Sequence, residues 1–321
     1  EGGGKSGKPV GVGARYLGYG LVDAFGETAG QMQRECFRGG PTFRVDFVLR
    51  GGLAAETVYG FRAALKLFGL LGGLGSRVRR GWGSVSLKTI DDDRGGAAPG
   101  WRRPATVQAY EAELRDLLDG TDRVSGSGFP LTAFARESHV WVADRSAPLA
   151  LGALDRLGRA FLNYRGHGRS QDRQVGGQTI QKQFMEDHDW FRRDLDDVDI
   201  PYRSAFGLPH LYGKSAGVTP DGETDRRASP MLFHVHPLDG GFVPVVTLLP
   251  TRFLPEGMQV SATRPKDSCK RPYDLGSAYG ARGASGLDVL QDFIGLRPDP
   301  VFQPNEVVRF REIWGRREAS A

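Results

Sequence analysis

A glycine-rich segment at residues 72–85, GGLGSRVRRGWGSV, holds the residues whose types and spacing could do chemistry. Five of its first twelve positions are glycine, which permits positive φ angles and close approach of the backbone to a ligand. Its arginine forks match phosphate oxygens, its tryptophan could stack on a base, and its backbone N–H groups could form an anion-binding nest. These features favour a sugar-phosphate ligand over the alternative, a tight turn with solvated arginines. The residues expected to bind are Gly73, Gly75, Ser76, Arg77, Arg79, Arg80 and Trp82.

A second basic stretch, Arg165–Gly177, has the sequence RGHGRSQDRQVGG. Its glycines and charges leave little apolar area to offset the entropy of ordering, so we expect a loop that is mobile without partners. His167 lies between Arg165 and Arg169, and this setting favours phosphate contact over catalysis. Arg165, His167 and Arg169 are therefore further candidate RNA contacts.

Catalytic and metal-binding signatures are weak along the chain. Gly2–Lys8 imitates a Walker A loop, but Pro9 stands where that motif needs a magnesium-binding hydroxyl. His234 and His236 share one face of an expected strand and could chelate a metal. No third ligand has suitable spacing, so a strand-surface or partner contact is the preferred interpretation. We expect no catalytic residue, no metal and no cofactor.

The composition is that of a globular protein. The chain has 321 residues and a mass of 35.0 kDa, with 39% hydrophobic and 25% charged residues, which excludes wholesale disorder and fibrous repeats. The net charge is +5, and the excess of arginine among the basic residues fits either genome composition or heat adaptation, or else phosphate recognition. No apolar run approaches the roughly 18 residues of a membrane helix, and the two cysteines support no disulfide framework or zinc site. We expect a soluble, cytoplasmic protein.

Hydrophobic periodicity predicts mixed helices and strands. Thr42–Leu49 alternates as a half-buried strand, Ala54–Leu71 has helical spacing, and Ser84–Thr89 alternates again. With the glycine-rich loop between them, this order is the core of a ferredoxin-like or RRM-like α+β unit. We expect two such halves, residues 1–140 and 141–321. The other expected elements are helices at Thr106–Leu118, Ala147–Tyr164 and Ala284–Ile294, a strand at Val140–Asp144, a hairpin at 229–249 around Leu238–Gly241, and an irregular segment at Arg252–Gly283.

The glycine-rich segment resembles the glycine-rich loop of RAMP proteins, the repeat-associated proteins of CRISPR systems. Its pattern is most similar to the first RAMP subunit of the type III-B (Cmr) complex. The resemblance spans about Arg15 to Pro255, and members of that family usually open with a strand and a basic helix that this sequence does not show. Shorter supporting motifs are RYLGYG at Arg15–Gly20, CFRGGPTF at Cys36–Phe43, FGLP at Phe206–Pro209 and RRASP at Arg226–Pro230.

The resemblance implies a non-catalytic RNA-binding subunit with two RRM-like halves. It would contact the 3′ region of the guide RNA, capture target RNA, and assemble with the sixth Cmr subunit and the backbone subunit. In such complexes the backbone subunit cleaves the target. The alternative is a metal-independent guide-processing endoribonuclease of the same fold, for which His167, Tyr164 and Lys182 form the only local set of acid–base and charge-stabilising groups. A purely architectural subunit would bind no RNA.

Overall fold

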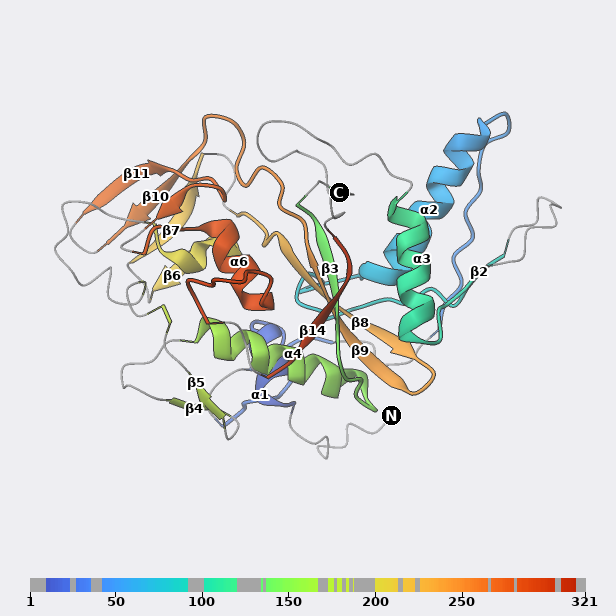
Figure 1. Cartoon of the computed structure of the whole chain (residues 1–321), viewed down its shortest axis with the longest axis horizontal. Coiled ribbons are helices and arrows are strands. Elements are labelled where there is room, and N and C mark those ends of the chain that lie inside the picture. The colour runs from blue at the N-terminus through green and yellow to red at the C-terminus, as the bar shows by residue number, and fades with distance from the viewer. Residues whose placement is uncertain are drawn as a thin grey trace. The chain divides into compact units, whose positions relative to one another are not determined.

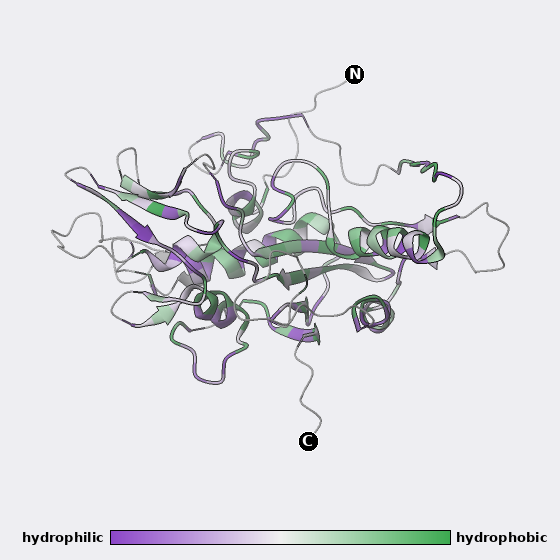
Figure 2. Cartoon of the chain, turned by 90° about the horizontal axis from the view of Figure 1, so that it is seen from above, coloured by the Kyte–Doolittle hydropathy of each residue, from purple (hydrophilic) through white to green (hydrophobic). Residues whose placement is uncertain are grey.

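The computed structural model of the chain is an α+β structure (Figure 1). Antiparallel strand pairs include β10 (Gln259–Thr263) with β11 (Ser268–Pro272), β7 (Ala216–Asp221) with β10, β3 (His139–Ala143) with β14 (Phe310–Trp314), and β6 (His210–Tyr212) with β7. Its helices carry both hydrophobic and hydrophilic residues, as amphipathic elements do (Figure 2). The structure describes residues 10–23, 27–35, 42–91, 101–119, 134, 137–166, 173–175, 178–180, 183–184, 187, 200–212, 216–222, 226–264, 267–279, 282–303 and 307–315.

The chain divides into two compact units, each built from segments far apart in the sequence. Unit 1 comprises Glu1–Asp122, Arg145–Asp155 and Phe233–Val245. Unit 2 comprises Arg123–Asp144, Arg156–Leu232 and Val246–Ala321. These bounds differ from a single division near residue 140, because residues 145–155 and 233–245 pack with the N-terminal segment.

Unit 1 is built around two long helices. The Tyr110 hydroxyl of α3 donates a 2.7 Å hydrogen bond to the Leu70 carbonyl of α2, and Lys66 Nζ lies 2.8 Å from the Glu113 carboxylate. These helices begin within a residue of their predicted starts, because apolar side chains at three- and four-residue spacing need a common face to bury. The elements of unit 1 are α1 (Val12–Leu17), α2 (Ala55–Leu71), β1 (Thr89–Ile90), β2 (Trp101–Arg102) and α3 (Val107–Asp119). The unit also includes those residues of β8 (Met231–Leu238) and β9 (Gly241–Leu248) that lie within Phe233–Val245.

The alternating segment Thr42–Leu49 is not a strand, contrary to the sequence prediction. It has no ladder partner among the described residues, and Phe43, Val45 and Phe47 are each more than half exposed. Alternation marks a strand only where a neighbouring strand supplies hydrogen bonds and a surface to pack on. Likewise, the predicted strand Ser84–Thr89 contains only the first residue of β1.

Unit 2 holds most of the sheet structure. The predicted strand at Val140–Asp144 and the predicted hairpin at 229–249 are both confirmed, and they belong to one four-stranded sheet with the order β14-β3-β9-β8. Of the hairpin strands β8 and β9, residues Met231–Leu232 and Val246–Leu248 belong to unit 2. The second four-stranded sheet has the order β11-β10-β7-β6, so Arg252–Gly283 is more regular than expected. The elements are β3 (His139–Ala143), β4 (Arg173–Val175), β5 (Gln178–Ile180), a 3₁₀ turn η1 (Tyr202–Phe206), β6 (His210–Tyr212), β7 (Ala216–Asp221), β10 (Gln259–Thr263), β11 (Ser268–Pro272), β12 (Ala278–Tyr279), β13 (Ala284–Ser285), α6 (Gly286–Ile294) and β14 (Phe310–Trp314).

The helices of unit 2 enclose an aromatic core. The predicted helix at Ala147–Tyr164 is confirmed as α4 (Ala150–Arg165), which contributes residues to both units. The predicted helix at Ala284–Ile294 is confirmed as α6, which starts at a capping box of Ser285 and Asp288. Rings from α4, η1 and α6, and from the chain before η1 and after α6, meet with centroids about 5 Å apart in edge-on, tilted or stacked pairs. These rings are Phe161, Tyr164, Phe184, Phe206, Phe293 and Phe302.

Candidate nucleic-acid interface

The glycine-rich loop in unit 1 closes on itself directly after α2. The Leu74 N–H donates a 2.9 Å hydrogen bond to the Gly83 carbonyl, and Gly73 bridges Ser84 in antiparallel fashion. Gly83 has φ +73°, and a Cβ atom there would lie only 2.0 Å from the Leu74 oxygen. Glycine is therefore required at this position for both its dihedral angle and its size.

The returning limb of the loop runs along β8. The Phe233 N–H donates to the Arg79 carbonyl at 3.1 Å, and the Val235 N–H donates to Ser84 Oγ at 3.1 Å. Arg80 and Phe233 form a parallel bridge. Because β8 ends the strand order of its sheet, these bonds cover backbone groups that would otherwise form an open edge. The loop backbone is thereby fixed.

Trp82 secures the loop to α1. Its indole N–H donates a 3.1 Å hydrogen bond to the Ala14 carbonyl, and a Cβ atom on Gly18 would lie 2.7 Å from Trp82 Nε1. Helix α1 is held in turn by Asp155, whose Oδ1 accepts from the backbone N–H groups of Gly13 and Ala14 at 2.8 and 3.1 Å. Trp82, expected from the sequence to stack on a base, is thus engaged in packing within unit 1.

The arginine side chains of the loop differ in their surroundings. Arg77, which has φ +62°, and Arg79 are exposed, whereas the half-buried Arg80 guanidinium lies 5.8 Å from the centroid of the Phe233 ring. Although the residue is exposed, desolvation by neighbouring atoms lowers the pKa of the Arg79 guanidinium. Arg34 adds a cation, since its Nη1 lies 3.5 Å from Ser76 Oγ. The exposed tip of the loop is therefore positively charged.

The expected backbone nest is smaller than the sequence suggests. The N–H groups of Arg80 and Gly81 donate within the loop, to Arg77 and Val78 carbonyls at 2.8 and 3.1 Å, as does that of Leu74 to Gly83. These three amides are committed to holding the loop. Gly75, at φ +90° with no atom within 4 Å of an added Cβ, lies at the open tip. Anion binding at this loop depends mainly on side chains.

Two buried histidines lie beneath the loop. His234 Nδ1 is 2.9 Å from the Gly72 carbonyl, which can only accept, so Nδ1 carries the proton. The His236 ring lies 4.5 Å from the Tyr110 ring, centroid to centroid, and both histidines are at most 1% exposed. Burial lowers the pKa of His234 to about 4 and that of His236 to about 3. The pair is a neutral part of the core, not the strand-surface contact expected.

The second basic stretch belongs to unit 2, and only its first two residues and Arg173–Val175 are described. The half-buried Arg165 guanidinium lies 5.0 Å from the centroids of both the Phe161 and Phe206 rings, an arrangement typical of cation–π contact. His167 and Arg169 lie outside the described residues. Of these three predicted contacts, Arg165 alone is among the residues that the structure describes.

The endoribonuclease set loses one of its members. Tyr164 is 1% exposed, and its hydroxyl donates a 2.6 Å hydrogen bond to the Val289 carbonyl. Burial raises the pKa of Tyr164 well above its ordinary value, and because its one hydroxyl proton is donated to Val289, the group is not available to stabilise the charge of a reacting phosphate. His167 and Lys182 lie outside the described residues.

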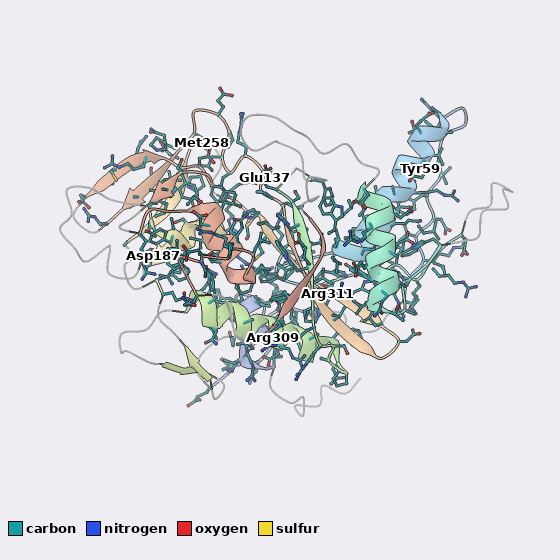
Figure 3. All side chains as sticks on the ribbon, viewed as in Figure 1. Tyr59, Glu137, Asp187, Met258, Arg309 and Arg311 are labelled. Carbon is teal, nitrogen blue, oxygen red and sulfur yellow. The ribbon has the colours of Figure 1, made fainter. Side chains whose placement is uncertain are left out.

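Asp187 is a buried carboxylate (Figure 3). It accepts hydrogen bonds from the backbone N–H groups of Tyr202 and Arg203 at 2.8 and 2.7 Å, and its Oδ2 lies 3.4 Å from Arg203 Nε. Burial raises the pKa of Asp187 to about 6, although the Arg203 charge and these N–H groups oppose the shift. The carboxylate holds the start of η1, which is a structural role.

A basic hollow in unit 1 was missed. It has a volume of about 230 Å³ and is lined by Lys88, Thr89, Arg102 and Arg103. The adjacent arginines 102 and 103 were the available signal, but the sequence analysis did not single them out. The two arginines lie opposite Lys88 and Thr89 because β1 and β2 pair across an inserted segment. No local sequence pattern indicates that pairing.

Comparisons of the chain with family models, with curated proteins and with solved structures returned no match. Within the described ranges, no group of three or more histidine, cysteine, aspartate or glutamate side chains could hold a metal ion. None of the described helices combines the length and apolar character that a bilayer crossing requires. Function is therefore inferred from the glycine-rich loop.

Proposed function

We propose that this chain is a non-catalytic RNA-binding subunit of a type III-B CRISPR RNA-guided complex, built on two RAMP halves. It contacts the 3′ region of the guide RNA or captures target RNA, and it assembles with the sixth Cmr subunit and the backbone subunit in the cytoplasm. The observation that carries the proposal is a glycine-rich loop whose backbone is fixed on β8 and α1 while Arg77 and Arg79 remain exposed.

This arrangement suits a flexible polyanion. A fixed backbone spares the loop most of the ordering entropy on binding, and guanidinium groups pair with phosphate oxygens in a bidentate manner. Arg34, beside Ser76, extends the same positive tip. Because phosphate contacts carry no base information, the loop would bind RNA of any sequence and leave target choice to base pairing with the guide.

The test is the salt dependence of RNA binding by the full chain. Each phosphate neutralised on a single strand contributes about 0.7 to the slope of log affinity against log salt. The double variant R77A/R79A should therefore flatten the slope by up to about 1.4 for a labelled guide RNA, with little change in thermal stability. Arg80→Ala is the matched control, because it removes the same charge from a guanidinium that lies on Phe233.

We expect the control variant to lower the melting temperature and to change the salt slope less than the double variant does. An unchanged slope in the double variant would remove the loop from the RNA path and contradict the proposal. Cleavage of repeat RNA by the chain in EDTA would instead support the endoribonuclease, an outcome that the buried Tyr164 hydroxyl disfavours.

A further inference from the structure

We propose that Tyr19, on the turn that follows α1, is the residue on which a base of the bound RNA stacks, next to the phosphate contact at Arg77, an assignment that rests on the proposed function. Tyr19 is 58% exposed although it is a large aromatic residue. It belongs to the RYLGYG motif, Arg15–Gly20, to which the phosphate contacts of the loop assign no role.

The turn that carries Tyr19 is held firmly in unit 1. The N–H groups of Leu21 and Val22 both donate to the Gly18 carbonyl, at 2.7 and 3.0 Å. Gly18 itself lies against the indole of Trp82, since a Cβ atom there would be 2.7 Å from Nε1. The turn and the glycine-rich loop are therefore fixed on the same side chain, and little ordering entropy is lost when a ligand binds between them.

Tyr19 lies close to the positive tip of the loop. Its neighbour Gly20 has φ +86°, and a Cβ atom on Gly20 would lie 3.4 Å from Arg77 Nη2. Consecutive Cα atoms are about 3.8 Å apart, so the Tyr19 Cα atom is within roughly 9 Å of that guanidinium nitrogen. Arg34, beside Ser76, is a further cation of the same tip. The separation is short enough for a phosphate at Arg77 and the base of the same or the next nucleotide at Tyr19.

The combination of groups favours single-stranded nucleic acid. Surfaces that bind single strands combine cations along the phosphate backbone with aromatic rings on which the bases stack, and such stacking tolerates any base. Trp82, the aromatic residue of the loop, is half-buried, and its indole N–H is already used by the Ala14 carbonyl. A nucleotide has one phosphate and one flat base, so it can use the guanidinium of Arg77 and the ring of Tyr19 together.

The experiment compares two single-stranded probes that carry the same phosphates, an oligoadenylate and an abasic ribose-phosphate oligomer of equal length. Tyr19→Leu keeps the apolar bulk of the side chain but removes the flat ring. We expect this variant of the full chain to bind oligoadenylate about tenfold more weakly, the order of effect for one lost stacking contact. Its affinity for the abasic oligomer should not change, and the salt slope should stay the same because no charge is lost.

Two variants serve as controls. Tyr19→Phe retains the ring and should bind oligoadenylate as the unsubstituted protein does. Tyr59→Leu removes a tyrosine of unit 1 that is 66% exposed on α2, about 18 Å along the helix from Leu71, where the loop begins, and it should change neither affinity. Equal weakening of both oligomers by Tyr19→Leu, equal effects of the two leucine variants, or weak binding by Tyr19→Phe would overturn the stacking role.

The same titrations separate this inference from the proposed function. Binding of both oligomers that requires Arg77 and Arg79 but is unaffected by Tyr19→Leu would keep the function and reject the role of Tyr19. Binding of neither oligomer by the unsubstituted protein would contradict the proposed function, and the role of Tyr19 with it. A loss confined to oligoadenylate in Tyr19→Leu would support both.

Discussion

Acidification should unfold unit 1 through the buried histidine pair. His234 has its pKa lowered from 6.5 to about 4 by burial, and His236 has its pKa lowered to about 3. In the unfolded chain both rings would titrate near pH 6.5. Between pH 6.5 and pH 4 the unfolded state therefore binds protons that the native state does not, and the free energy of unfolding falls as the pH falls.

The size of the effect follows from the shift. One pKa unit corresponds to about 1.4 kcal/mol, so the shift at His234 is worth roughly 3 kcal/mol. That stability is present above pH 6.5 and is lost as the pH approaches 4. His236 adds to the loss over the same range, because its native pKa is lower still. A total of this size is a large part of the 5–15 kcal/mol that is typical of natural domains.

The assay is urea unfolding at several pH values between 7 and 4.5, followed by tryptophan fluorescence. The variant is His234→Asn, whose side-chain amide can still donate to the Gly72 carbonyl but does not titrate. We expect the unsubstituted protein to lose stability more steeply with acid than the variant, even if the variant is less stable at pH 7. His210→Asn in β6 is the control for loss of a histidine outside the pair. Parallel pH profiles for the unsubstituted protein and His234→Asn would refute the reasoning.

Two further predictions concern the loop itself. Gly83→Ala should destabilise the protein by at least about 2 kcal/mol, because it combines backbone strain with a clash against the Leu74 carbonyl. Gly75→Ala should cost only about 1 kcal/mol, since that site has positive φ but open space; thermal melts that rank the two equally would contradict this order. Trp82→Phe should cost about 1 kcal/mol by removing the hydrogen bond to Ala14, measured by urea unfolding. A stability unchanged by Trp82→Phe, together with weaker RNA binding, would return Trp82 to the base-stacking role.

Much of the local structure could be predicted from the sequence. The hairpin follows from an Asp-Gly-Gly turn between two apolar runs, and α2 and α3 follow from apolar residues at helical spacing. In each case the signal and the structure it specifies lie within about twenty residues of one another. Thr42–Leu49 had an equally good pattern and failed, because a strand also needs a partner that no local pattern supplies.

The surroundings of the candidate site could not be predicted in the same way. The loop lies on β8, about 150 residues further along the chain, and Trp82 contacts α1, about 65 residues earlier. No alternation or spacing rule links such positions. The sequence analysis therefore identified the glycines and arginines of the loop, but it could not tell that Arg80 packs on Phe233 while Arg77 and Arg79 are exposed.

This division within the loop makes structure and binding separable by mutation. Gly83, Trp82 and the two acceptors of β8 amides, the Arg79 carbonyl and the Ser84 hydroxyl, keep the loop folded, whereas Arg77 and Arg79 expose their side chains. Substituting the exposed arginines should therefore change the salt dependence of binding without lowering stability, and substituting the supporting residues should lower stability first. A loop that served only to cover the edge of β8 would have no use for two exposed guanidinium groups at its tip, and their removal would alter neither quantity.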